Sequence, residues 1–221
     1  MNMKKIISFF IVACCAMCAT AAKVVWQIGV ADNSGTELAL GPSEYKKFLA
    51  HDFGYEDRYF LVGTSIDKND FPYVLPGPDD TWGGTWSTSG WRTHDANILF
   101  GIKKLPKHGK WKLVVDLVDA NPSRSVVKVM VNSAEKKFEI KGHSKGVLEG
   151  NLQDAKEQIL EFPISADDLK KGGNMVTVSV LEGGWIVFDQ IRLEGADELV
   201  LEKNNEYAFL RNVAPAEYEM E

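Results

Sequence analysis

The stretch MVTVSVLEGGWIVFDQIRLEG, residues 175–195, indicates the fold more clearly than any other part of the chain. Its two halves are rich in Val, Ile, Phe and Trp, residue types that favour β-strands. Gly183 and Gly184 separate the halves, and a glycine pair between two apolar runs is a hairpin signal. We therefore predict two long antiparallel strands joined by a tight turn.

The same β pattern recurs on the N-terminal side of this stretch. In KWKLVVDLVDA, residues 110–120, Trp111, Leu113, Val115 and Leu117 occupy alternate positions. Such alternation is typical of a strand with one buried face. Further strands are predicted at residues 24–30, 36–41, 57–63, 97–102, 125–132, 136–142, 159–164 and 198–203.

Two of these strands carry signals about their neighbours. Residues 136–142 follow 125–132 after a short turn at Ser133, so we expect the two strands to pair. Pro163 has no amide hydrogen to donate, which favours an edge position for residues 159–164. Many short strands, little helix and connections rich in Gly or Pro predict one all-β domain, an antiparallel β-sandwich. A brief helix is expected after Ser43, at residues 43–49, and one helical turn after Ser165.

The N-terminus has the order of a secretory signal. The basic pair Lys4-Lys5 precedes an apolar run and then small residues up to Ala22. We expect a signal peptide at residues 1–22 and a secreted or periplasmic protein. The alternative is lipid anchoring through Cys14. All three cysteines lie in this leader, so the rest of the chain must be stabilised by burial or by a bound ion.

Charge excludes some classes of partner. The chain has 31 acidic and 25 basic residues, a formal charge of −6, and two of the basic residues belong to the leader. An acidic chain without a basic stripe argues against nucleic acid and anionic membrane surfaces. A neutral or weakly charged glycan fits this charge better than a strongly anionic polysaccharide.

Residues 71–101, FPYVLPGPDDTWGGTWSTSGWRTHDANILFG, hold three of the six tryptophans. As far as Asp95 no strand or helix period fits, which predicts a long irregular loop. Loops of this length are functional or disordered, and disordered segments are poor in aromatic residues. The residues that we expect to contact a ligand are Asp79, Asp80, Trp82, Trp86, Trp91, Arg92, His94 and Asp95.

Two interpretations of this loop are open. Indole faces with carboxylate, cationic and hydroxyl groups between them suit a ligand that is both apolar and hydroxyl-rich, such as a sugar. Alternatively, the tryptophans close one end of the sandwich and bind nothing. Both could hold for different tryptophans.

A cation site is a further hypothesis. Asp32 and Glu37 lie in and after the first predicted turn, and Asp189 lies in the last long strand. First and last strands commonly neighbour each other in a jelly roll, so these oxygens could converge on a structural Ca²⁺. The alternative is that Asp32 shapes its turn with Asn33, while Asp189 accepts a backbone amide.

The sequence gives little support for catalysis. The four histidines show none of the tight spacings that bring two imidazoles to one metal, and neither a G-x-S-x-G motif nor a phosphate-binding glycine loop occurs. Asp79 and Asp80 are a carboxylate pair of the kind that glycosidases use, but they are adjacent in the chain. A small lyase or glycosidase is therefore a third hypothesis.

A family resemblance adds to this interpretation. WQIGVADNSGTELAL, residues 26–40, and GNMVTVSVLEGGWIVFDQIRLEG, residues 173–195, resemble the two ends of the third, carbohydrate-binding-like domain of rhamnogalacturonan lyases, polysaccharide lyase family 4. Residues 71–102 resemble versions of this domain in secreted pectin-degrading proteins of Bacteroidetes-type bacteria. The similarity extends over roughly residues 24–195.

The resemblance implies a galactose-binding-like jelly roll at residues 23–195, with a C-terminal extension at 196–221 that could add an edge strand. It does not imply lyase activity, because the catalytic Lys and His of those lyases belong to a separate domain. We therefore expect a secreted, non-catalytic module or accessory protein for pectic, rhamnogalacturonan-type polysaccharide. Its partners would be plant cell-wall or related polysaccharide and a lyase or rhamnosidase.

Overall fold

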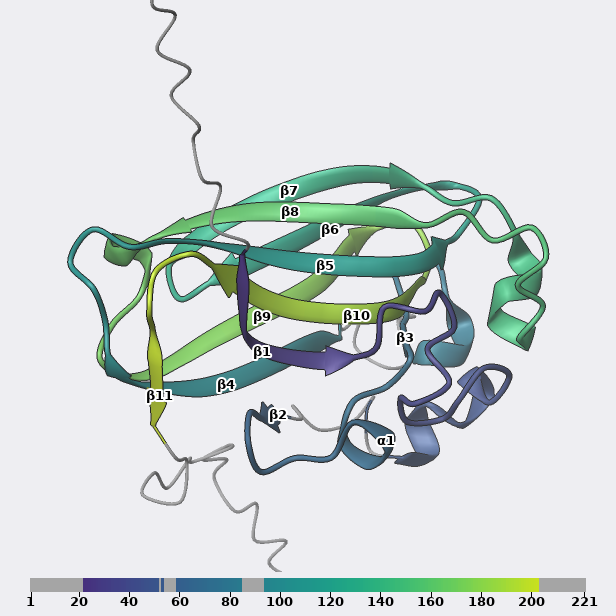
Figure 1. The fold of residues 1–221 in the computed structure, drawn as a ribbon. Coiled ribbons are helices and arrows are strands. Elements are labelled where there is room, and N and C mark those ends of the chain that lie inside the picture. Colours follow the sequence, from purple (N-terminus) through teal and green to yellow (C-terminus); the bar gives the residue numbers. More distant parts are fainter. Residues whose placement is uncertain (1–21, 52, 54–58, 85–93, 203–221) are drawn as a thin grey trace, which may run out of the picture.

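The computed structural model describes residues 22–51, 53, 59–84 and 94–202. They form two facing β-sheets (Figure 1). The first sheet has the spatial order β1 (Lys23–Gly29), β10 (Ile186–Gly195), β5 (Lys110–Ala120) and β8 (Gln158–Ser165), and the short β3 (Val74–Leu75) also pairs with β10.

The second sheet has the order β11 (Val200–Glu202), β4 (Asp95–Lys104), β9 (Gly172–Glu182), β6 (Arg124–Val131) and β7 (Ala134–Lys141). All these pairs are antiparallel, whereas β2 (Tyr59–Leu61) lies parallel to β4. The fold is thus an antiparallel jelly-roll sandwich with a few short helices, and the predicted fold class is confirmed.

The core lies between the two sheets. Val176, Val178 and Val180 of β9 are buried, as are Leu113 and Leu117 of β5. Alternation along each strand brings these side chains to one face. Full burial of such a side chain stabilises the fold by about 1.5–3 kcal/mol, so a chain whose described part contains no cysteine can be held by packing alone.

Most of the predicted strands are present at nearly the predicted bounds. β5 covers residues 110–120 as predicted, and β7 pairs with β6. β8, which carries Pro163, is an edge strand. β11 lies at the edge of the second sheet, and β1 pairs with β10 from Lys23↔Gly195 to Gly29↔Gln190.

The predicted hairpin at residues 175–195 is wrong. β9 lies between β4 and β6 in one sheet, whereas β10 lies between β1 and β5 in the other. Residues 183–185 therefore cross from sheet to sheet. Both strands are central and mostly buried, and each is already paired on its two edges, so neither has an edge left for the other.

In the first half, one strand prediction fails and one helix prediction is confirmed only in part. Residues 36–41 form no strand, and only an isolated bridge links Ala39 to Pro72. Residues 43–49 give two short 3₁₀ turns, η1 (Tyr45–Lys47) and η2 (Leu49–His51), and Ser43 does not cap them. Ser43 has a φ of 105°, a backbone conformation outside the helical region, so the first helical turn starts after it.

The other helices of the described residues are three to five residues long: α1 (Asp67–Asp70), η3 (Thr81–Gly83), η5 (Lys145–Glu149) and η6 (Ala166–Asp168). The last is the turn expected after Ser165. Within the described residues, no helix has both the length and the apolar character to cross a membrane.

The crossing between the sheets requires glycine at position 183. Gly183 has a φ of +80°, and a Cβ there would lie 2.3 Å from the carbonyl oxygen of Arg124. We expect Gly183→Ala to lower the free energy of unfolding by at least about 1–2 kcal/mol in urea denaturation, because a left-handed backbone alone costs this much. Gly173→Ala is the matched control: a Cβ there meets nothing within 4 Å, and we expect a change within about 0.5 kcal/mol. Equal effects would contradict this account.

Candidate functional site

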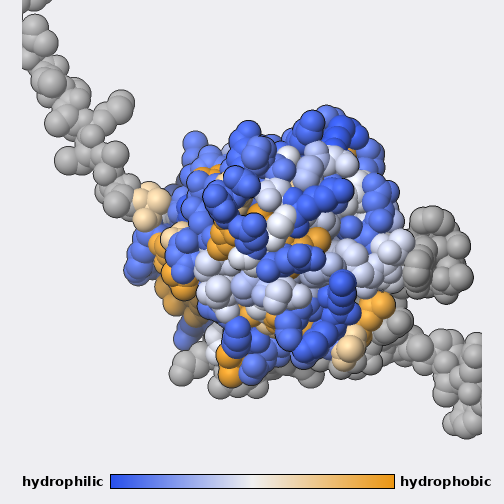
Figure 2. All heavy atoms as spheres, turned by 90° about the vertical axis from the view of Figure 1, so that its right-hand side faces the viewer, coloured by the Kyte–Doolittle hydropathy of each residue, from blue (hydrophilic) through white to orange (hydrophobic). Residues whose placement is uncertain are grey.

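Several connections between the strands gather at one end of the sandwich, the right-hand side of Figure 1. We call this the loop end; it carries residues 76–84, 121–123, 142–157 and 183–185. Figure 2 views it directly and shows a mainly hydrophilic surface with small hydrophobic areas. The described part of the predicted ligand loop lies here, because the Asp79 amide donates to the carbonyl of Gly183 at 3.1 Å.

Asp80 is the buried anchor of this loop. Its side chain is turned inward, the residue is 7% exposed, and Oδ2 accepts the Gly77 amide at 2.8 Å. Burial raises the pKa of Asp80 to about 6; hydrogen bonds from the backbones of Gly77 and Trp185 and from the Trp82 side chain oppose the shift, and the Asp79 carboxylate adds to it. Asp80 therefore positions its neighbours and is not available to a ligand.

Trp82 lies in η3, directly after this anchor, and is half-buried. Its indole meets the ring of Tyr45 edge-on at 5.0 Å between centroids, and the ring of Phe48 at 6.1 Å. Such edge-to-face pairs contribute about 0.5–1.5 kcal/mol each beyond simple burial. Trp82 is thus partly a structural plug, and only part of its surface faces solvent.

His94 closes the loop from its other side. The residue is 6% exposed, its ring packs against Phe48 at 5.3 Å, and Nε2–H donates to the carbonyl of Gly83. This bond joins the start of β4 to η3. His94 therefore stabilises the base of the loop.

Two predicted ligand carboxylates are exposed, those of Asp79 and Asp95. Asp95 accepts a hydrogen bond from the hydroxyl of Ser179 on β9. Trp86, Trp91 and Arg92, which are also predicted ligand residues, lie outside the described residues.

The sequence did not identify Tyr45 and Phe48 as part of this site. Their spacing of three residues places both on one face of the helix predicted at residues 43–49, and this shared face is the signal that the sequence offers. The sequence could not show that this face packs against Trp82, because the contact joins segments more than thirty residues apart.

The three predicted cation ligands take separate hydrogen-bonding roles. Asp189 Oδ1 accepts the amides of Asp32 and Ser34, at 3.3 and 3.2 Å, while Glu37 Oε1 accepts the Val30 amide at 2.6 Å. Burial raises the pKa of Asp189, and the amides of Ser34, Asp32 and Asn33 oppose that shift. Over the part of the chain that the structure describes, no three His, Cys, Asp or Glu side chains are grouped to share a metal ion. These contacts fit the turn-capping interpretation; cation binding stays a prediction.

Residues 24–193 match the family described as CBM-like: Polysaccharide lyase family 4, domain III. The chain belongs to this family. The suspected resemblance is therefore confirmed, and it extends over nearly all of the two sheets.

A relative and two solved structures resemble this domain III protein. The rhamnogalacturonate lyase of Dickeya dadantii (strain 3937) is 24% identical over 183 residues, which are 78% of this chain and 28% of the lyase. The chain thus spans little more than a quarter of that relative. CBM35 from Cellvibrio japonicus Abf62 aligns at 12% identity and a TM-score of 0.35 over 51% of this chain and 72% of its own. A family 35 carbohydrate-binding module from an environmental isolate aligns at 16% and 0.33, over 50% and 69%.

The pKa of Asp80 makes a prediction about stability. Because about 6 lies above the ordinary value of 3.8, this group's stabilising contribution is complete below about pH 3.8 and is lost as the pH rises through about 6. Asp80→Asn resembles the neutral acid at every pH. We expect the free energy of unfolding of the variant, minus that of wild type, to rise by about 2–3 kcal/mol between pH 4 and pH 7. Urea denaturation across that range measures it; a constant difference would refute the assignment.

The turn-capping interpretation predicts indifference to calcium. If the Asp32 carboxylate is engaged by the Ser34 hydroxyl, and those of Glu37 and Asp189 by backbone amides, excess calcium and a chelator should give the domain the same melting temperature, since only a bound ion stabilises the folded state. Differential scanning calorimetry tests this. A calcium-dependent rise that Asp189→Asn abolishes would instead support the cation hypothesis.

Proposed function

We propose that this chain is a secreted, non-catalytic glycan-binding module or accessory protein for the degradation of pectic, rhamnogalacturonan-type polysaccharide. The observation that carries the proposal is the match of residues 24–193 to a carbohydrate-binding-like domain of a polysaccharide lyase family. The pectic ligand follows from the lyase family and from the similarity to a rhamnogalacturonate lyase. Secretion rests on the signal-like residues 1–22, with lipid anchoring through Cys14 as the alternative.

The loop end is the proposed contact surface. Asp80 and His94 hold the loop from below, Trp82 is partly open to solvent, and the exposed carboxylates of Asp79 and Asp95 can accept hydrogen bonds from sugar hydroxyls. An aromatic surface beside fixed acceptors is the combination that a hydroxyl-rich ring recognises. Two exposed carboxylates favour neutral sugars over uronates.

The second candidate function is docking on a partner polysaccharide lyase or glycoside hydrolase. The inward packing of Trp82 against Tyr45 and Phe48 favours it, because a closed loop end can serve a protein interface as readily as a sugar. The short span relative to the Dickeya lyase, 28% of its length, fits a module that works beside catalytic domains.

A small lyase or glycosidase has less support. Its proposed acid–base pair was Asp79 and Asp80, and Asp80 is buried against the Gly77 amide. A glycosidase needs two carboxyl groups facing one bond from opposite sides. Release of unsaturated or reducing ends from rhamnogalacturonan by the purified protein would restore this hypothesis.

Isothermal titration with oligosaccharides of rhamnogalacturonan and of neutral pectic galactan tests the proposal. We expect binding to at least one of them, with Trp82→Ala and Trp86→Ala each raising Kd about fivefold, the equivalent of roughly 1 kcal/mol per lost aromatic contact. Asp79→Ala should weaken binding as well, whereas its matched control Glu135→Ala, an exposed acid on β7, should not. If none of the oligosaccharides binds, the glycan-binding function is contradicted and docking on a partner enzyme remains as the candidate function.

A further inference from the structure

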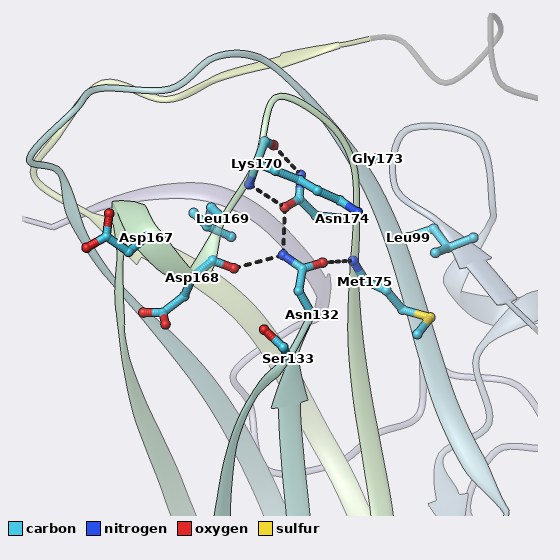
Figure 3. Close-up of a pocket in the computed structure, with 10 residues that line it drawn as sticks. All are labelled: Leu99, Asn132, Ser133, Asp167, Asp168, Leu169, Lys170, Gly173, Asn174 and Met175. Carbon is cyan, nitrogen blue, oxygen red and sulfur yellow. Dashed lines mark hydrogen bonds between the residues drawn. The ribbon is translucent and has the colours of Figure 1, made fainter.

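Figure 3 shows an open pocket of about 610 Å³. Its turns lie at the end of the sandwich opposite the loop end of Figure 1. β6 runs from Arg124 at the loop end to Val131 beside the pocket. The walls come from the turn between β6 and β7, from the η6 connection and the start of β9 that follows it, and from β4. The volume falls within the range of about 300–1,000 Å³ that is usual for small-molecule sites. The lining residues are named below where the argument uses them.

Two asparagine side chains fix the shape of this pocket. Asn132 Nδ2 donates to the carbonyl of Asp168 at 2.8 Å and to Asn174 Oδ1 at 2.9 Å, and its Oδ1 accepts the Met175 amide at 3.1 Å. Asn174, which is 2% exposed, accepts the Lys170 amide at 3.0 Å and donates to that residue's carbonyl at 2.8 Å. Figure 3 shows these bonds as one continuous chain. The two amides are thus used in building the walls.

A second set of bonds fixes the η6 wall. The amide and the hydroxyl of Ser165 both donate to Asp168 Oδ2, at 2.8 and 2.7 Å. The Asp168 carboxylate is therefore committed to capping, while Asp167 beside it is exposed. A pocket whose walls are held without a ligand loses little entropy on binding one.

The groups that face solvent around the pocket are chemically mixed. Ser133 offers a hydroxyl, Asp167 a carboxylate and Lys170 an ammonium group, and all three residues are exposed. Leu99 and Met175 add apolar surface. A sugar hydroxyl both donates and accepts, so it can pair with each of the three polar groups, and the C–H faces of its ring suit the apolar part. The opposite charges of Asp167 and Lys170 leave the lining without a net charge that would select an anion or a cation.

Gly173 keeps the pocket open. Its φ lies outside the left-handed region, and a Cβ added there would meet nothing within 4 Å. Neither backbone strain nor packing therefore demands glycine at this position. Since Gly173 lines the pocket, any larger side chain would occupy part of it.

We propose that this pocket is a second saccharide-binding site, which takes a short uncharged stretch of glycan. The inference rests on the proposed glycan-binding function and adds a second point of contact to it. β9 separates the two sites, from Gly173 to Glu182, and at about 3.3 Å per residue they lie roughly 30 Å apart. One long polysaccharide, or two, can then be held at both ends of the domain, and binding to a polymer exceeds binding to a short oligosaccharide.

The test is the number of binding sites, measured by isothermal titration with neutral pectic galacto-oligosaccharides. We expect two sites in wild type and one in Gly173→Phe, because the ring occupies part of the pocket and competes with a bound sugar. Lys170→Ala should weaken the second site roughly tenfold, as expected for a lost charged hydrogen bond. Lys171→Ala, its exposed neighbour outside the lining, should leave both sites unchanged.

The outcomes separate this inference from the proposed function. One wild-type site that persists in Gly173→Phe and is lost in Asp79→Ala overturns the pocket alone. One site that Gly173→Phe removes supports the pocket and contradicts the loop end. No binding by wild type overturns the glycan-binding function and the pocket with it. Urea denaturation of Gly173→Phe verifies that the fold is intact, and Lys170→Ala tests the pocket independently of that variant.

Discussion

The crossing from β9 to β10 is the constraint on which the loop end depends. Its backbone groups are bonded to connections of both sheets: the Gly183 carbonyl to the Asp79 amide at 3.1 Å, and the Trp185 carbonyl to the Asn121 amide at 2.8 Å. The Gly184 amide and carbonyl both bond the Ser125 hydroxyl, at 3.2 and 3.1 Å. Buried backbone groups need such partners, so the crossing fixes where each loop begins.

Successive residues of the loop are each held by a separate contact, beginning at this crossing. Asp79 is bonded to the crossing, Asp80 turns inward onto Gly77, and Trp82 follows on η3 against the aromatic rings of Tyr45 and Phe48. If the proposed function holds, stability and recognition depend on the same few residues. A buried carboxylate is a costly anchor, and its value is that it holds an indole at a defined angle beside open solvent.

Much of the fold could be predicted from sequence because alternation is a local property. Trp111, Leu113, Val115 and Leu117 reveal a strand without reference to anything else, and the bounds of β5 were correct. Pairing is not local. Gly183-Gly184 gives the same signal whether the chain turns back beside itself or crosses to a facing sheet, and only the neighbours on both edges of β9 and β10 decide the matter.

The candidate site was likewise predictable in its residue composition but not in its three-dimensional arrangement. Residue types identified a stretch where aromatic and acidic groups gather, but not which of them turn inward. Asp79 and Asp80 are identical in sequence terms, yet one is exposed and the other is buried. The pocket beside Asn132 and Asn174 had no signal at all, because asparagine and glycine between strands are the ordinary composition of turns.

The pairing of Lys23 with Gly195 has a mechanical consequence. The first strand begins where the last long strand of its sheet ends, so tension applied between these two points acts across the β1–β10 ladder and not along it. Such a load would peel the ladder open one hydrogen bond after another, starting at its outer end, instead of shearing all the bonds together. A domain loaded in this way yields at low force. A force applied through the loop end would instead be resisted by the strands of both sheets together.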